Sequence, residues 1–393
     1  MFVPAFFLEY QGAFLFYIIL ILIIIYFRNK IEWQTFGIGL YKTKIGLKLM
    51  ERLGTKYRGL VQVLGYTGVG VGFVGMTAIS YMLLFGFWKI LVDPTAPAVV
   101  SPVIPGFPIP GVGITIPLIT GWLALFVVIV IHEFSHGVVS RAHNIPVKSS
   151  GLLVFGPIAG AFVEPDEKKM MKEHESVQYA LFAAGPFSNI LMTLLVSLVS
   201  AFIIIPLITF MTIPSGIQID SVTDNYGADN ASIEAGMIVL GINNVETVTQ
   251  EEMSKELDKI SPGEVALVKT NRGEYAVTTT QHPNNEASRK GYLGVNLKQK
   301  YDPKYQGTFF AGLLYTIQWI KEFFYWIMLL NLGIGLANLL PLGPVDGGRM
   351  LQTACRQIVG DTKRGDWWWK KISIFTLIFL LIALLVPLIR AIL

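Results

Sequence analysis

Residues 118–136 read LITGWLALFVVIVIHEFSH, an apolar run that ends in two histidines and a glutamate. The apolar part, Leu118 to Ile131, has the composition of a transmembrane helix. A charged side chain at the centre of such a helix costs about 2.5–3.5 kcal/mol on insertion scales, so polar groups there are normally paired, metal-bound or functional. The spacing of His132 and His136 places both imidazoles on one helix face as zinc ligands, with Glu133 beside them as a general base. The pattern predicts a metalloprotease active site in the bilayer.

The composition agrees with a membrane setting for this motif. The chain has 393 residues, of which 53% are hydrophobic and only 15% charged, as in an integral membrane protein. The net charge of +4 is too small to indicate a nucleic-acid partner, and none is expected. Cys355 is the single cysteine, which excludes intramolecular disulfides and a cysteine-based zinc cage.

Six apolar stretches are predicted to cross the bilayer, and the first is interpreted as a retained helix, not a signal peptide. They are Gly12 to Phe27, about Gly68 to Leu91, the motif helix from Leu118, Val177 to Met211, Phe323 to about Pro341, and Ile372 to Leu393. Gly185-Pro186 interrupts the fourth stretch. The apolar piece Thr308 to Ile320 is expected at the interface, because Lys321-Glu322 separates it from the fifth span.

The basic residues alternate between the connections and predict an orientation. The loop Ile31 to Tyr57 is rich in Lys and Arg, whereas Asp93 to Pro117 has neither. Positive loops favour the cytosol, so the N-terminus is expected outside and the His-Glu motif toward the cytosolic side of a multi-pass plasma-membrane protein. The basic loop has two interpretations, an amphipathic helix on anionic lipid headgroups or a solvated charged loop.

A catalytic zinc site needs a third protein ligand besides the two histidines. Cys355 lies beyond membrane depth, and His143 would need a distorted helix to join. His174 lies in a charged stretch, and His282 lies in the extramembrane segment. None of the four is favoured.

A carboxylate at the end of the fifth span is the better candidate. Residues 338–349 read NLLPLGPVDGGR, in which Pro341, Pro344 and a glycine pair break the helix. Non-helical backbone at membrane depth is tolerated only where it is buried or lines a wet cavity. Asp346 on this break is the predicted third ligand. The alternative is a turn Asp-Gly just past a helix end.

These residues resemble the site-2 protease family of intramembrane zinc metalloproteases. The family pairs HExxH on one span with Asn…Pro…Asp-Gly on another, here His132–His136 and Asn338…Pro341…Asp346-Gly347. The resemblance implies that His132, His136 and Asp346 bind Zn²⁺. It implies Glu133 as the general base and Asn338 as a polar group near the scissile carbonyl.

Two further segments are similar to the family. Gly156 to Val163 looks like its membrane re-entrant hairpin, and Gly185-Pro186-Phe-Ser-Asn189 lies on the fourth span. The resemblance covers roughly residues 118–212 and 305–360. An exposed hairpin edge would hold an unwound substrate by strand pairing.

An insert of mixed charge, residues 214–304, lies between the two catalytic halves. Ile217 to Val222, Val265 to Thr270 and Tyr275 to Thr280 are predicted strands, and Gln250 to Ile260 is a predicted helix. The stretch from Ala235 resembles the core of PDZ domains, although Leu240-Gly241 replaces its usual Gly-Asp. The insert is expected outside the membrane as a module that docks or filters peptide segments. The alternative is a purely structural β-domain.

The predicted fold is an α-helical polytopic membrane protein with about six transmembrane helices, a re-entrant hairpin and an inserted small α+β PDZ-like domain. Its parts are residues 1–97, 98–213, 214–304 and 305–393. The predicted activity is zinc-dependent hydrolysis of peptide bonds in membrane-spanning proteins, with membrane lipid as the surroundings. The alternatives are a metal or ion transporter and a catalytically silent peptide-binding sensor.

Overall fold

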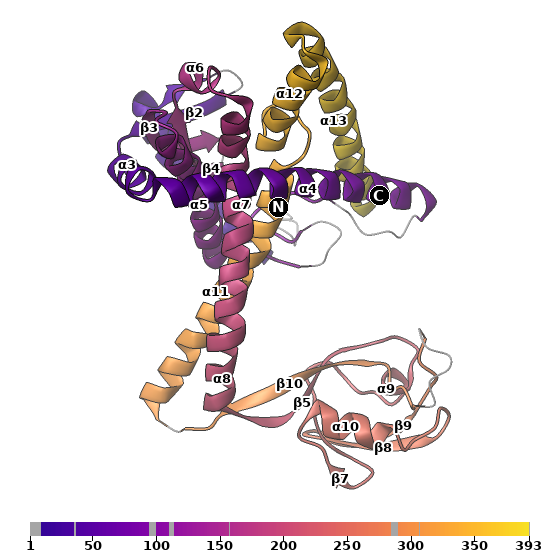
Figure 1. The fold of residues 1–393 in the computed structure, drawn as a ribbon. Coiled ribbons are helices and arrows are strands. Elements are labelled where there is room, and N and C mark those ends of the chain that lie inside the picture. Colours follow the sequence, from indigo (N-terminus) through magenta and orange to yellow (C-terminus); the bar gives the residue numbers. More distant parts are fainter. Residues whose placement is uncertain are drawn as a thin grey trace, which may run out of the picture. The chain divides into compact units, whose positions relative to one another are not determined.

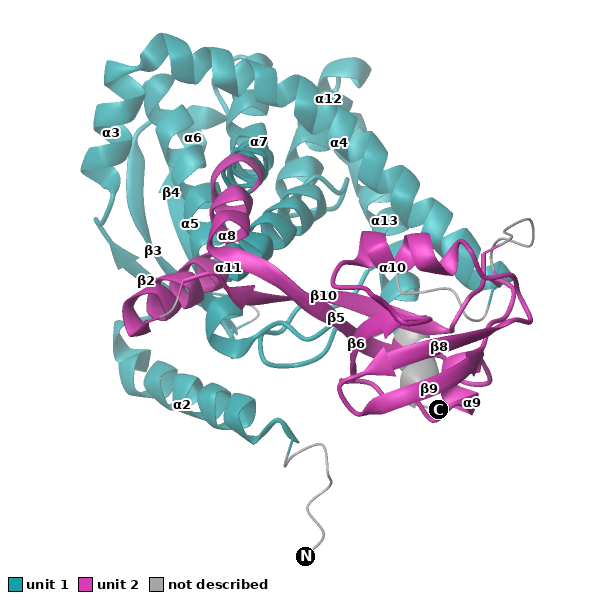
Figure 2. Cartoon of the chain, turned by 90° about the horizontal axis from the view of Figure 1, so that it is seen from below, with its two compact units in different colours: residues 1–200, 321–393 teal, residues 201–320 magenta. Residues whose placement is uncertain are grey.

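The computed structural model describes residues 9–34, 37–93, 100–109, 114–156, 158–283, 290–305 and 307–392. Pro157 of the predicted hairpin lies outside these residues. The chain divides into two units, residues 1–200 with 321–393 and residues 201–320 (Figure 2). The membrane motifs all belong to unit 1.

Unit 1 is mainly helical (Figure 1). Its longer helices are α2 (Gln11–Phe27), α3 (Leu47–Lys56), α4 (Arg58–Val92), α5 (Leu118–Ala142), α7 (Glu175–Val199), α12 (Asp346–Val359) and α13 (Thr362–Ile392). The helix α7 continues through the π-helix η3 (Ser200–Ile204) into α8 (Ile205–Met211), and α11 covers Thr308–Asn338. Six helices of the described residues are long and apolar enough to cross a membrane, which confirms the predicted polytopic membrane protein.

The fifth span differs from the prediction. Helix α11 runs without interruption through Lys321-Glu322, so Thr308 to Ile320 is not a separate piece. Both charged side chains are exposed, and neither residue type breaks a helix. The helix ends at Asn338 and not at Pro341, since a proline disfavours helical backbone at the residue before it and donates no N–H.

Small residues let the helices of unit 1 approach closely. On α4, a Cβ added at Gly68 would lie 3.1 Å from Phe187 of α7, and one at Gly75 would lie 2.5 Å from Leu339. Such contacts are typical of membrane helices, which associate through close packing of small residues. Buried Val128 of α5, Val196 of α7 and three residues of α11 (Trp326, Ile327 and Leu330) form a further cluster. These contacts fix α7 between α4 and α5.

A four-stranded antiparallel sheet lies beside α5, in the order β1-β2-β3-β4. Its strands are β1 (Glu32–Trp33), β2 (Ile38–Thr43), β3 (Val147–Phe155) and β4 (Ile158–Pro165). Strands β3 and β4 form the predicted hairpin, whose re-entry into the membrane stays a prediction. The basic loop therefore supplies the strands β1 and β2, which its sequence does not predict, besides the short helix α3. Strand β4 is at an edge of this sheet.

Unit 2 has its own sheet of six strands, in the order β10-β5-β6-β8-β9 with β7 paired to β6. The strands are β5 (Thr212–Val222), β6 (Ile238–Ile242), β7 (Val245–Glu246), β8 (Val265–Thr270), β9 (Gly273–Thr278) and β10 (Val295–Pro303). Two short helices, α9 (Gly227–Asn230) and α10 (Gln250–Leu257), complete it, and Ile217, Val239 and Met253 lie in its core. Its PDZ-like character stays a prediction.

Candidate metal centre

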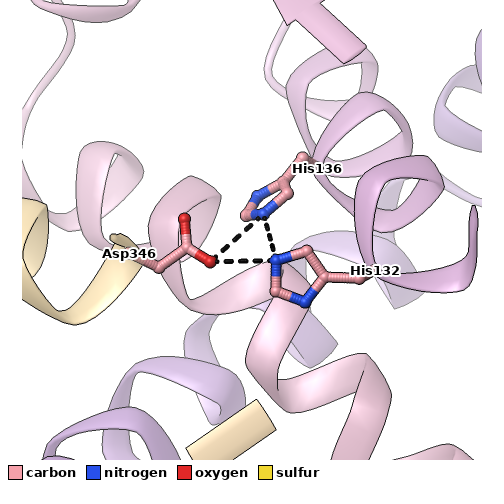
Figure 3. A group of neighbouring side chains, drawn as sticks. All are labelled: His132, His136 and Asp346. Atoms are coloured by element: carbon pink, nitrogen blue, oxygen red, sulfur yellow. Dashed lines mark hydrogen bonds and ion pairs between the residues drawn. The ribbon is translucent and has the colours of Figure 1, made fainter. Parts of the chain in front are cut away.

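Two histidines and an aspartate converge within unit 1. His132 and His136 lie one turn apart on α5, and their Nε2 atoms are 3.3 Å from each other. Asp346 Oδ2 lies 3.1 Å from His132 Nε2 and 3.4 Å from His136 Nε2 (Figure 3). Two segments more than 200 residues apart thus place three possible ligand atoms at one point.

Asp346 reaches α5 because of the glycine pair that follows it. Asp346 is the first residue of α12, after the extended Val345. A Cβ added at Gly347 would lie 2.3 Å from the Leu339 carbonyl oxygen, and one at Gly348 would lie 2.2 Å from that of Leu342. Only glycine allows the chain to fold back this closely, so the break after α11 delivers the carboxylate.

The donor set fits a metal ion. Asp346 Oδ2 is buried and has no hydrogen-bond partner among the described residues, although two imidazole nitrogens lie near it. A buried carboxylate oxygen without a hydrogen bond is costly unless a cation neutralises it. Two imidazoles and one carboxylate are the ligand set of several catalytic zinc sites, which keep a fourth position open. The three residues could therefore hold Zn²⁺.

Helix α7 contacts both imidazoles at their Nδ1 atoms. His136 Nδ1 lies 2.7 Å from the Leu181 carbonyl oxygen, and His132 Nδ1 lies 3.2 Å from Asn189 Nδ2. These contacts occupy the Nδ1 atoms and leave both Nε2 atoms directed at Asp346. A Cβ added at Gly185 would lie 2.5 Å from both Nε2 atoms, so the glycine makes room for the site.

Glu133 lies next to the first histidine and contacts the sheet. Its Oε2 accepts a hydrogen bond of 3.1 Å from the Val163 N–H of strand β4. This bond fixes one carboxylate oxygen near the hairpin. The carboxylate thus lies between the histidine pair and an edge strand.

A cavity of about 570 Å³ opens onto these groups. All five predicted site residues line it: His132, Glu133, His136, Asn338 and Asp346. Charged side chains also line it, and two pairs of them are ion pairs: Lys42 with Glu164, and Glu167 with Arg349. The five predicted site residues therefore share one cavity with charged side chains.

Neighbouring side chains stabilise the negative charge of Glu164 on the hairpin strand β4. The Ser149 hydroxyl donates a 2.6 Å hydrogen bond to Glu164, and the Lys42 ammonium lies 3.5 Å away. The Ser149 hydrogen bond, with the nearby positive charge, holds the pKa of Glu164 below its usual value. Glu164 is therefore ionised at neutral pH.

Other candidates lie elsewhere or have other partners. Cys355 is buried and free, and His143 packs edge-on against Tyr66 with a ring distance of 5.7 Å. Asn338 lines the cavity, but its Nδ2 donates to the carbonyl of Ile334 in its own helix at 3.0 Å. Its role near a scissile carbonyl stays a prediction.

Sequence reasoning missed the groups that support the ligands. Two of them, the Leu181 carbonyl and the Val163 N–H, belong to the backbone and leave no signal in the sequence. Gly185 and Asn189 lie in a segment that only the family resemblance pointed out. No spacing rule connects that segment to α5.

Comparisons with known proteins show which family the chain belongs to. The family model described as "Peptidase family M50" matches residues 120–384, which include both parts of the histidine–aspartate cluster. The chain is 30% identical to "Uncharacterized protein MJ0971" of Methanocaldococcus jannaschii over 345 residues, 84% of this chain and 81% of that protein. It is 24% identical to "Zinc metalloprotease RasP" of Shouchella clausii over 220 residues, about half of each chain (46% and 51%). The chain therefore belongs to peptidase family M50, the site-2 protease family of membrane metalloproteases.

Proposed function

We propose that this protein is an intramembrane zinc endopeptidase that cleaves membrane-spanning proteins, with His132, His136 and Asp346 as zinc ligands. The observation that carries the proposal is the convergence of their Nε2, Nε2 and Oδ2 atoms beside Glu133 on one cavity. A sensor that only bound peptides would need no carboxylate beside such ligands. A transporter would need polar groups along several spans.

Glu133 is the general base of this proposal. His132, His136 and Asp346 would hold the zinc ion, which when bound would supply Lewis-acid chemistry for the water and the scissile carbonyl. The Glu133 carboxylate takes a proton from water in the cavity and gives it to the leaving amine nitrogen. The Val163 N–H holds Oε2 in place, so the carboxylate is oriented before a substrate arrives. The Asn338 amide, which lines the same cavity, is the proposed polar group for the scissile carbonyl, and it would have to leave its bond to the Ile334 carbonyl to act.

The substrate must present an extended segment, because helical hydrogen bonds hide the carbonyl. Strand β4 is an edge strand, and its Val163 lies beside Glu133. An unwound substrate paired with this edge would bring its backbone toward the general base. Unit 2 is proposed to be a PDZ-like module that selects peptide segments outside the membrane. The zinc site is proposed to lie toward the cytosolic side. The basic loops support this orientation, and the plasma membrane is the proposed location.

Glu133→Gln tests the proposal, because it keeps the shape of the side chain and removes the base. The full-length protein is reconstituted with a membrane-embedded substrate, and cleavage and bound zinc are measured together. We expect cleavage to fall about 10²–10⁴-fold, the usual contribution of a general base, with zinc content unchanged.

Glu173→Gln is the matched control, since Glu173 does not line the cavity. It should cleave like the unmodified protein. Full cleavage by Glu133→Gln would contradict the assigned base. Zinc bound with equal affinity after removal of a proposed ligand would contradict the metal site.

A further inference from the structure

The Nδ1 atoms of the two histidines face different kinds of partner. A histidine that binds a metal through Nε2 is neutral and carries its proton on Nδ1, so Nδ1 needs a hydrogen-bond acceptor. His136 has one, the Leu181 carbonyl at 2.7 Å, which can only accept. His132 faces the Asn189 amide, which has both a donor and an acceptor. Because the Nδ1–H of His132 needs an acceptor, it determines which atom of the Asn189 amide must face the ring.

The Asn189 side chain has few other options. Its residue is completely buried, and its Oδ1 has no hydrogen-bond partner among the described residues. With Nδ2 at 3.2 Å from a protonated Nδ1, two N–H groups would face each other. Turning the amide by 180° exchanges its oxygen and nitrogen, which occupy nearly the same volume. In the turned amide, Oδ1 faces the Nδ1–H of His132 and accepts its hydrogen bond.

We propose that Asn189 is the positioning residue of His132: its Oδ1 accepts the Nδ1–H and keeps the Nε2 lone pair directed at the metal position. This inference rests on the proposed zinc site. Partners of this kind normally orient the ring and raise the basicity of the ligand, and their loss costs about 10–100-fold in metal affinity. Asn189 makes no contact with the reacting atoms in this role.

The surrounding helices hold the amide in place. A Cβ added at Gly335 of α11 would lie 3.1 Å from Asn189 Cβ and 3.4 Å from the Pro186 carbonyl oxygen, so α11 packs tightly behind this turn of α7. The amide is thus fixed on a rigid element, as a positioning group requires.

Three variants of the full-length protein in detergent test the role. Asn189→Leu keeps the approximate volume without any hydrogen bond, and Asn189→Asp keeps only acceptors. Thr193→Val, one turn along α7, removes a hydroxyl that bonds within its own helix and is the control. The zinc dissociation constant is measured by competition with a chelator, the Co²⁺ form is examined by its d–d absorption, and folding is checked by the melting temperature of the metal-free protein.

We expect Asn189→Leu to raise the zinc dissociation constant about 10–100-fold and to shift the Co²⁺ bands. Asn189→Asp should bind zinc at least as tightly as the unmodified protein, and Thr193→Val should not differ from it. Zinc binding by Asn189→Leu with unchanged affinity would overturn the proposal. Equal weakening by Asn189→Asp would also overturn it, because that result requires the amide to donate.

The Asn189→Asp result and one further control, His132→Ala, separate the possible failures. If Asn189→Leu does not fold, Asn189→Asp decides alone, since tight zinc binding supports an acceptor and weak binding rejects it. His132→Ala is measured beside them. Retained zinc in His132→Ala would reject the proposed metal site itself. Lost zinc in His132→Ala with unchanged affinity in Asn189→Leu would reject only the positioning role.

Discussion

Helices α5 and α7 contribute to the same site in different ways. Helix α5 carries both histidines and Glu133, and all three are evident from their spacing. Helix α7 carries no candidate ligand. It supplies a carbonyl oxygen to His136, an amide to His132, and the space that Gly185 leaves open. Helix α5 thus carries the reactive side chains, and helix α7 holds those side chains in position.

The difference predicts graded effects of mutation. A change on α5 that removes a ligand removes a bond to the metal. A change on α7 keeps all three ligands but shifts their positions. Such a shift costs only a fraction of the free energy of zinc binding. The zinc dissociation constant is therefore the quantity that distinguishes mutations on α5 from mutations on α7.

The largest effect is expected on α5. His132→Ala removes one of the three proposed protein ligands, so zinc should be lost in dialysis against buffer without added metal, and cleavage should be lost with it. Bound zinc is measured per molecule of purified protein. His143→Ala is the matched control, because His143 follows the same helix and packs against Tyr66 instead of the cluster. Zinc loss in both variants would show that the effect is not specific to the ligand.

A smaller effect is expected from Gly185→Ala on α7. The added Cβ would lie 2.5 Å from both Nε2 atoms, so the histidines must move apart from their present positions. Overpacking of this kind costs about 1–3 kcal/mol, which corresponds to about 5–150-fold weaker zinc binding. Gly70→Ala on α4 is the control, since no atom lies within 4 Å of its added Cβ. An unchanged zinc dissociation constant in Gly185→Ala would show that α7 does not limit the space of the site.

The same contrast explains what could be predicted from the sequence. The spans were predictable because hydrocarbon requires long apolar helices, and the histidine spacing was predictable because it repeats with the helical turn. The uninterrupted α11 was not, because a Lys-Glu pair ends an apolar run in the sequence without ending the helix. Strands β1 and β2 were not, because their basic loop contains no clear apolar alternation and the pairing of β2 with β3 is non-local.

The candidate site divides in the same way. His132, Glu133 and His136 follow from one local pattern, and Asp346 was inferred from a helix break. The convergence of His132, His136 and Asp346 within 3.4 Å depends on close glycine contacts, at Gly185 between distant helices and at Gly347 within the helix break, which no local pattern encodes. Backbone groups such as the Leu181 carbonyl are present in every residue, so their use becomes visible only in the folded chain.

The smallest effect is expected from Gly335→Ala on α11, which contacts α7 and no ligand. Its added Cβ would lie 3.1 Å from Asn189 Cβ, so Asn189 must shift slightly, and zinc binding should weaken about fivefold (~1 kcal/mol). Gly333→Ala, two residues away, has no atom within 4 Å of its added Cβ and should not change affinity. Since the effect passes through the Asn189 amide, Gly335→Ala should add almost nothing to Asn189→Leu. Simple addition of the two effects would mean that α11 acts on the site by another route.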